Sequence, residues 1–149
     1  MTKLFVFSLF IILISGCSNL GSKKINYSEY ITTENLAKSE KIDSFIVKDW
    51  IILDDSHLLV ISKPNNHYLL STKKDCVDLE KAERIAFKTS QANKLLSGID
   101  YLSTLGDNPD CLIVDIRDLH EVQYGTLQNT KIKTSRNNPT DDMSFSRHR

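Results

Sequence analysis

The fold is decided by a stretch that reads HLLVISKPNNHYLLS from residue 57 to residue 71. Two apolar runs, at 57–62 and 68–71, flank the segment Pro64-Asn65-Asn66-His67. Asparagine tolerates the positive φ angles that a tight primed turn requires, and the flanking runs are rich in residues that pack well in strands. The stretch therefore predicts two antiparallel strands joined as a β-hairpin.

Further strands are predicted on both sides of this hairpin. Runs rich in branched and aromatic residues occupy 45–53, 84–89 and 111–116, and a weaker run surrounds Ile99 and Tyr101. Residues 45–53 are apolar at nearly every position, so this strand is expected in the centre of the sheet. In the two weaker strands, alternation predicts that the apolar residues face the core, namely Ile85, Phe87, Ile99 and Tyr101.

Helical signals are few. The segment 77–83 predicts one short helix, and a loose helix is expected at 33–41, where a threonine can cap the first turn. The predicted fold class is mainly β, or β-rich α+β. We expect a small antiparallel sheet or partly open barrel of five to six strands, with one short helix and one disulfide.

The composition limits the function classes. The chain has 149 residues, of which 40% are hydrophobic and 26% charged, so it suits one domain and is not collagen-like, coiled-coil or wholly disordered. Lysine and arginine together number 19, and so do aspartate and glutamate. Because no field of one sign attracts nucleic acid, we expect no nucleic-acid partner.

The first residues have the character of an export signal. Lys3 supplies a positive charge, and the 11 residues at 4–14 are apolar except for Ser8. A membrane-spanning helix needs about 20 apolar residues, so this run is too short to be a permanent span. It predicts a signal peptide over residues 1–16.

The segment ends in Ile14-Ser15-Gly16-Cys17. These residues resemble the lipobox of bacterial lipoproteins, in which the cysteine is acylated and the chain is cut before it. The resemblance implies that acyl chains on Cys17 anchor the protein in the membrane. Ser18 is not aspartate, which in the enteric sorting pattern favours the outer membrane, so we expect its periplasmic face. The alternative is a plain signal peptide with an accidental cysteine.

Two cysteines remain beside Cys17, namely Cys76 and Cys111. An even pair in a chain exported to an oxidising compartment predicts a disulfide. Two unpaired buried thiols are the alternative. A metal site is less favoured, because no second cysteine or histidine lies at ligand spacing beside either residue.

Composition divides the chain into four segments. We expect a lipoprotein signal peptide at 1–16, a lipidated N-terminus and flexible tether at 17–41, a β-rich globular domain at 42–122, and a disordered polar tail at 123–149. The tether and the tail are assigned because both are polar, with only scattered apolar residues.

The strongest candidates for a catalytic role are Asp54, Asp55, His57 and His67. The two histidines lie at opposite ends of a hairpin arm, where about 3.3 Å per residue separates them by roughly 20 Å, too far to share a metal. Adjacent strand residues point to opposite faces, and Asp-Asp-Ser is ordinary turn composition, so the two aspartates are interpreted first as a turn. We expect no catalytic residue, no metal and no cofactor.

Three aromatic residues have two interpretations each. Trp50, Tyr68 and Tyr101 are either core residues, the commoner role of an aromatic side chain in a strand, or part of a binding surface. Trp50 and Tyr68, together with Asp54 and Asp55, form the candidate surface for a ligand or partner.

An ordered set of residues resembles a family of small bacterial lipoproteins known only as a domain of unknown function. The set spans 42–119 and includes Trp50, Leu53-Asp54-Asp55, Leu58-Leu59-Val60, Tyr68-Leu69-Leu70, Cys76 and Cys111-Leu112-Ile113. The resemblance implies an envelope lipoprotein with a β-rich domain, and it assigns no activity or catalytic residue.

These observations favour a non-catalytic binding or structural module, tethered to the membrane, with an envelope protein as partner. One alternative is a small-ligand-binding or inhibitor module of the periplasm. The other is a hydrolase that uses Asp54 and Asp55.

Overall fold

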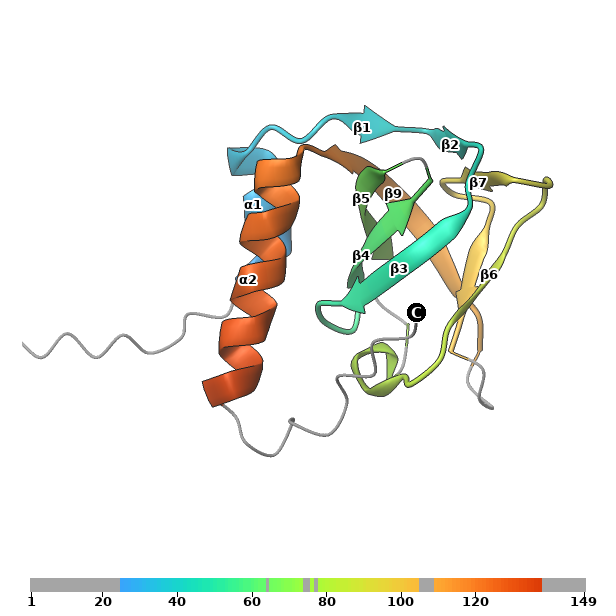
Figure 1. Cartoon of the computed structure of the whole chain (residues 1–149). Coiled ribbons are helices and arrows are strands. Elements are labelled where there is room, and N and C mark those ends of the chain that lie inside the picture. The colour runs from blue at the N-terminus through green and yellow to red at the C-terminus, as the bar shows by residue number, and fades with distance from the viewer. Residues whose placement is uncertain (1–24, 64, 74–75, 77, 105–108, 138–149) are drawn as a thin grey trace, which may run out of the picture.

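The computed structural model describes residues 25–63, 65–73, 76, 78–104 and 109–137 (Figure 1). The expected signal peptide, Cys17 and the last residues of the chain lie outside these ranges. The elements, in chain order, are α1 Tyr27–Thr33, β1 Lys38–Ser39, β2 Lys41–Asp43, β3 Val47–Ile52, β4 His57–Ser62, β5 Asn66–Thr72, the 3-10 helix η1 Leu79–Lys81, β6 Ala86–Lys88, β7 Lys94–Leu96, β8 Tyr101–Ser103, β9 Cys111–Leu119 and α2 Glu121–Asn137.

Seven strands form one antiparallel sheet. Six of them follow the order β3-β4-β5-β9-β8-β6, and β1 pairs with the C-terminal half of β9. This sheet curls into a half-barrel, and β2 and β7 form a second, two-stranded sheet (Figure 1). The predicted β-rich class and the partly open antiparallel barrel are confirmed.

The predicted hairpin is present as β4 and β5. Its ladder runs from the pair His57 and Ser71 to the pair Ser62 and Asn66. Because the last pair leaves residues 63–65 between the strands, the loop is longer than the tight turn that the sequence predicted. Asn66 does not have a positive φ angle, since it already belongs to β5.

The predicted disulfide is also confirmed. Cys76 and Cys111 are bonded, their Cα atoms are 5.1 Å apart, and both side chains are buried. Cys111 is the first residue of β9, so the bond fixes the chain after β5 to the start of a central strand. Closing a loop of 35 residues stabilises a fold by about 3–4 kcal/mol when the effect is treated as lost chain entropy.

A buried core lies on each face of the main sheet. The inner core fills the half-barrel and consists of Ile42, Phe45, Ile52, Leu58, Val60, Tyr68, Leu70, Cys76, Leu79, Leu95, Leu102, Cys111, Ile113 and Ile116. The outer core lies on the other face and consists of Tyr27, Leu36, Leu53, Leu59, Leu69, Leu119, Tyr124 and Leu127. Successive residues of β4 and β5 alternate between these cores, which explains why the two strands are continuous apolar runs in the sequence.

The folded part extends beyond the predicted boundaries of 42–122 at both ends. Helix α1 begins at Tyr27, inside the expected tether, and buries that ring in the outer core. Helix α2 occupies much of the expected disordered tail and contributes Tyr124 and Leu127 to the same core. These two residues are three apart and lie on one helical face, so a short apolar stripe is enough to dock an otherwise polar helix.

Two predicted strands lie elsewhere than expected. β3, predicted as central, is an end strand of the main sheet and pairs only with β4. Its apolar run arises because Trp50 and Ile52 pack on the inner core and Ile51 on the outer core, so an end strand has apolar residues on both faces. Ile99 and Tyr101 face solvent, with exposed fractions of 52% and 41%. The inward positions are Asp100 and Leu102, and the buried Asp100 carboxylate accepts backbone N–H bonds of 2.7 Å from Ser90 and Leu96.

The remaining predictions are met in part. Ile85 and Phe87 pack against the inner core as expected, although the strand there is limited to β6. In the segment 77–83, where a helix was predicted, the structure has only the 3-10 turn η1. The helix predicted at 33–41 is replaced by α1, which lies earlier in the chain and ends at Thr33. Across the residues that the structure describes, no helix is long and apolar enough to cross a membrane.

The docking of α2 predicts a specific loss of stability. Leu127→Ala should lower the free energy of unfolding by about 2–4 kcal/mol, because Leu127 is fully buried. Val122→Ala on the same helix is the matched control, since Val122 is 79% exposed, and it should change stability by less than about 0.5 kcal/mol. Urea unfolding measures both, and equal midpoints for the two variants would show that α2 is not part of the domain.

Candidate functional site

A hollow of about 740 Å³ opens where three chain connections meet. The first wall is residues 34–37, which follow α1, and the second is residues 118–121 with Gln123, where β9 passes into α2. Residues 65–68, at the start of β5, complete the lining. Segments nearly ninety positions apart are brought together because β5 pairs with β9 and the link from α1 to β1 runs along β9.

The first wall is shaped by the way α1 ends. Asn35 adopts a left-handed backbone with φ 47°, and the Asn35 and Leu36 amides donate to the carbonyl oxygens of Thr32 and Ile31. This is a Schellman ending, in which an apolar residue after the turn packs back on the helix, and Leu36 is buried in the outer core. Arg117 Nη1 then donates to the Leu36 carbonyl over 2.9 Å, which fixes the wall to β9.

The second wall is the start of α2. The Gln123 side chain accepts the His120 backbone N–H at 2.9 Å, which satisfies one of the free amides at the helix start. The Tyr124 ring stacks on His67 of β5 with ring centroids 4.3 Å apart. Glu121 Oε2 lies 3.6 Å from His67 Nδ1. These contacts hold the helix start against the start of β5, so the hollow has a defined shape.

Tyr68 lies between these walls and is 92% buried, since its exposed fraction is 8%. Burial raises the pKa of Tyr68, and the Asp118 carboxylate acts in the same direction, against the effect of a hydrogen bond with Asn66. The phenol is therefore neutral at physiological pH and keeps its O–H group as a donor.

The hollow has an acidic lining. Glu34 comes from the connection after α1, and Asp118 and Glu121 come from the connection between β9 and α2. None of the described residues that line the hollow is lysine or arginine. Asp118 Oδ2 accepts a 2.7 Å hydrogen bond from the Ser39 hydroxyl, which is a neutral partner. Within the described parts of the chain, no group of three or more His, Cys, Asp or Glu residues is arranged to hold a metal ion.

A second polar cluster lies at the other end of the β4–β5 ladder. His57 Nδ1 is 2.9 and 3.1 Å from the two carboxylate oxygens of Asp54, and the Tyr27 ring lies against His57 with centroids 5.1 Å apart. Burial acts to raise the pKa of Asp54, but hydrogen bonds from His57 and from the Ser56 backbone outweigh it, so the pKa lies below its ordinary value. Burial, with Asp54 and Glu80 nearby, raises the pKa of Tyr27 to about 12.

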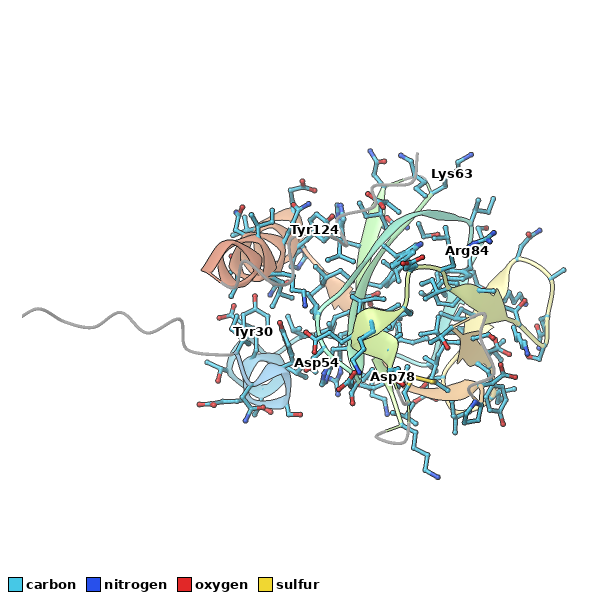
Figure 2. All side chains as sticks on the ribbon, turned by 90° about the horizontal axis from the view of Figure 1, so that it is seen from below. Tyr30, Asp54, Lys63, Asp78, Arg84 and Tyr124 are labelled. Atoms are coloured by element: carbon cyan, nitrogen blue, oxygen red, sulfur yellow. A yellow bond between two sulfur atoms is a disulfide. The ribbon has the colours of Figure 1, made fainter. Side chains whose placement is uncertain are left out.

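This cluster joins α1 to the sheet. Figure 2, seen from below, shows Asp54 beside α1 and Tyr124 on the side of α2 that faces the sheet. Asp55 accepts the backbone N–H of Glu80 at 3.2 Å, and Lys131 of α2 reaches both the Glu80 carboxylate and the Leu53 carbonyl at 3.0 Å. Each of these charged groups has a partner that ties one element to another, which is a structural role.

The four residues predicted as a surface do not lie together. Tyr68 lines the hollow, Trp50 is partly buried against the inner core, and Asp54 and Asp55 belong to the second cluster. The ladder places His57 opposite Ser71 and His67 opposite Ile61, so the two histidines lie toward opposite ends of the hairpin, as predicted.

The sequence did not single out the acidic residues of the hollow. Glu34, Asp118 and Glu121 stand at positions that were assigned to a tether, to the end of a strand and to a domain end. One local signal was available, since Gln123 follows His120 by three residues, the spacing of a reciprocal helix cap. That signal locates the start of α2 but not the pairing of β5 with β9 that creates the hollow.

Together, these features define the class of the protein: a disulfide-bonded antiparallel half-barrel, covered on its outer face by two helices, with a polar hollow between the connections. The chain belongs to a family of unknown function, DUF6491, whose model matches residues 1–135. No curated protein and no solved structure matches the chain. The family match therefore covers the described domain and brings no activity with it.

The Asp54–His57 contact predicts a pH-dependent contribution to stability. Asp54→Asn should lower the free energy of unfolding by about 1–2 kcal/mol at pH 7, because it removes a charged hydrogen-bond partner. Since the folded pKa of Asp54 is depressed, this contribution is complete above the unfolded value near 4 and is lost as the pH falls through the folded value.

Urea unfolding of wild type and variant from pH 7 down to pH 2.5 measures this difference. The two curves should converge only at the acid end. Asp43→Asn, at an exposed carboxylate of β2, is the control and should follow the wild type closely. A constant gap between wild type and Asp54→Asn at every pH would contradict the assignment.

Proposed function

We propose that this protein is a lipid-anchored binding module of the bacterial cell envelope, held at the periplasmic face of the outer membrane through acyl chains on Cys17. Two observations support this proposed location. The residues Ile14-Ser15-Gly16-Cys17 have the lipobox pattern, and the buried Cys76–Cys111 disulfide suits an oxidising compartment.

The anchor would hold the domain near the bilayer. Cys17 and Ile25, the first described residue, are eight positions apart. A chain segment of this length spans at most about 28 Å even when fully extended. Helix α1 starts two residues later and leads directly into the first wall of the hollow. A binding site there would meet partners that are themselves close to the membrane.

The hollow is the main observation that supports a binding role. Its volume lies in the range of about 300–1,000 Å³ that is typical of ligand sites, but its lining is mainly polar, unlike that of most drug-like pockets. An open polar hollow suits a polar group presented by an envelope protein, which is our first candidate. A small polar ligand of the periplasm is the second, and the volume of the hollow favours it equally.

The hydrolase alternative has less support. Asp54 is bonded to His57 and Asp55 to the Glu80 backbone, so the two carboxylates act separately and do not form an acid–base pair. Ser71 is the residue across the ladder from His57. The residue is 8% exposed, and its hydroxyl oxygen is buried. A nucleophile so covered has no open path to a substrate.

The anchor predicts a clear result in cells. The wild-type chain should incorporate an alkyne-labelled fatty acid and sediment with the outer membrane. Cys17→Ser should lose the label and appear in the soluble periplasmic fraction. Ser18→Ala is the control, because it leaves the acylated position intact. Membrane association of Cys17→Ser equal to that of the wild type would rule out the lipid anchor.

The binding role is tested by a photo-crosslinking residue placed at His120, which lines the hollow and is exposed. In intact cells it should give one discrete adduct, and Ala37→Trp should abolish that adduct by filling the hollow without changing a charge. The same residue placed at Glu83, an exposed position outside the hollow, is the control. Equal adducts from both positions, or adducts that survive Ala37→Trp, would contradict the proposal.

A further inference from the structure

We infer that the segment after helix α2, residues 138–149, covers an apolar patch on the outer face of the main sheet. The side chains that make the contact are Met143 and Phe145. The apolar patch consists of Ile99, Tyr101, Leu112 and Val114. It shares no residue with the lining of the hollow, so this inference does not depend on the proposed binding role.

The apolar patch lies where β8 pairs with the first half of β9. Tyr101 is directly opposite Leu112 in this ladder, and the Ile113 backbone N–H donates to the Asp100 carbonyl over 3.0 Å. The same register makes the other two patch residues neighbours of each other. The alternate residues of both strands are in the inner core, so the four patch side chains point to the outer face.

These side chains are exposed in the described domain. Five large apolar side chains are exposed in the described part of the chain, and three of them belong to the apolar patch, namely Ile99, Tyr101 and Val114. Helices α1 and α2 cover the outer face over β4 and β5, where they meet Leu59 and Leu69 (Figure 1). Apolar surface that is exposed in one continuous area marks a place where another group docks.

Helix α2 passes close to this end of the sheet. Lys131 of α2 donates to the carbonyl of Leu53, the residue after β3, over 3.0 Å. A row of bonded and paired residues leads from Leu53 across β4 and β5 to β9, namely His57, Ser71, Thr72 and Ile113. Three strand spacings, about 14 Å in all, therefore separate Leu53 from the row of the apolar patch.

The segment after α2 is long enough to cover this distance. From Lys131, α2 continues to Asn137, about 9 Å further along its axis. Met143 follows Asn137 by six positions and Phe145 by eight, which span up to about 20 Å and about 28 Å when the chain is extended. Both side chains therefore reach the apolar patch while α2 stays in place.

The segment also has the sequence pattern that such a contact requires. Met143-Ser144-Phe145-Ser146 alternates apolar and polar residues, so an extended backbone places Met143 and Phe145 on one side. Pro139, two positions after the last residue of α2, disfavours continuation of the helix. A methionine side chain adapts to an irregular apolar surface, and a phenylalanine ring packs well beside another aromatic ring such as Tyr101.

A second copy of the chain suits the apolar patch less well. Stable interfaces between proteins use about 20–30 residues from each partner, whereas this patch has only four side chains. The segment 138–149 is joined to the same domain through α2, so its effective concentration at the patch is in the millimolar range. A few apolar contacts are then enough to hold it there.

The test compares variants of the full mature chain carrying Cys17→Ser. Met143→Ser combined with Phe145→Ser should move the backbone amide signals of the patch residues, because the docked side chains are removed. The same variant should also give at least twofold higher fluorescence with the dye ANS, which binds exposed apolar surface. Amide chemical shifts and dye titration measure the two effects.

Ser144→Ala combined with Ser146→Ala is the matched control, since alternation points these side chains away from the apolar patch. It should leave the patch signals and the dye fluorescence unchanged. Ile99→Ser, added to the variant with Met143→Ser and Phe145→Ser, should remove the extra fluorescence and so locate the uncovered surface. Patch signals that do not move in the Met143 and Phe145 variant, or that move equally in the control, would overturn the inference.

Two further results would assign the apolar patch to a different occupant and refute the segment. If the patch signals depend on protein concentration and the chain sediments as a dimer, a neighbouring copy covers the patch. If the full chain binds vesicles of phosphatidylethanolamine and phosphatidylglycerol, and Ile99→Ser abolishes that binding while the Met143 and Phe145 variant retains it, the patch contacts lipid.

Discussion

The backbone pairing of strand β9 is the interaction on which the rest of the structure depends. β9 bonds to β5 along one edge and to β8 and β1 along the other, so every other part of the main sheet reaches it directly or through one of these strands. Its first residue carries the disulfide to Cys76, and its last residue lies two positions before helix α2. A register shift here would turn Ile113 and Ile116 out of the inner core and move both walls of the hollow.

Burial of both sheet faces decides how much of the fold could be predicted from the sequence. The hairpin, the strand that begins at Cys111 and the disulfide were predictable, because continuous apolar runs and an even cysteine pair depend only on local composition. Ile99 and Tyr101 misled the prediction, because apolar alternation does not say which face is inward when Asp100 is held inside by two backbone amides. Helix α2 was missed because, among residues 121–132, whose burial the structure describes, only Tyr124 and Leu127 are buried, and most of their neighbours are polar.

The candidate site was less predictable than the fold for a physical reason. Only His67 and Tyr68 were singled out as candidate site residues in advance. The acidic residues of the lining, at positions 34, 118 and 121, look like ordinary solvated positions. Their proximity follows from the β5–β9 register and from the Schellman ending of α1, neither of which leaves a strong local pattern. The Asp54–His57 pair, which looked more like a catalytic motif, lies outside the hollow. The His57 ring contacts Tyr27 of α1, so the pair helps to hold α1 against the sheet.

The central claim is that the hollow is a fixed part of the domain, because both helices belong to the same cooperative unit as the sheet. Native-state hydrogen exchange, read at single amides, tests this most directly. The account predicts that the amides of Tyr124 and Leu127 in α2 open with about the same free energy as those of Ile116 in β9. Exchange in α2 that is faster by several orders of magnitude, with β9 still protected, would show that α2 detaches from the sheet and that the hollow has no fixed second wall.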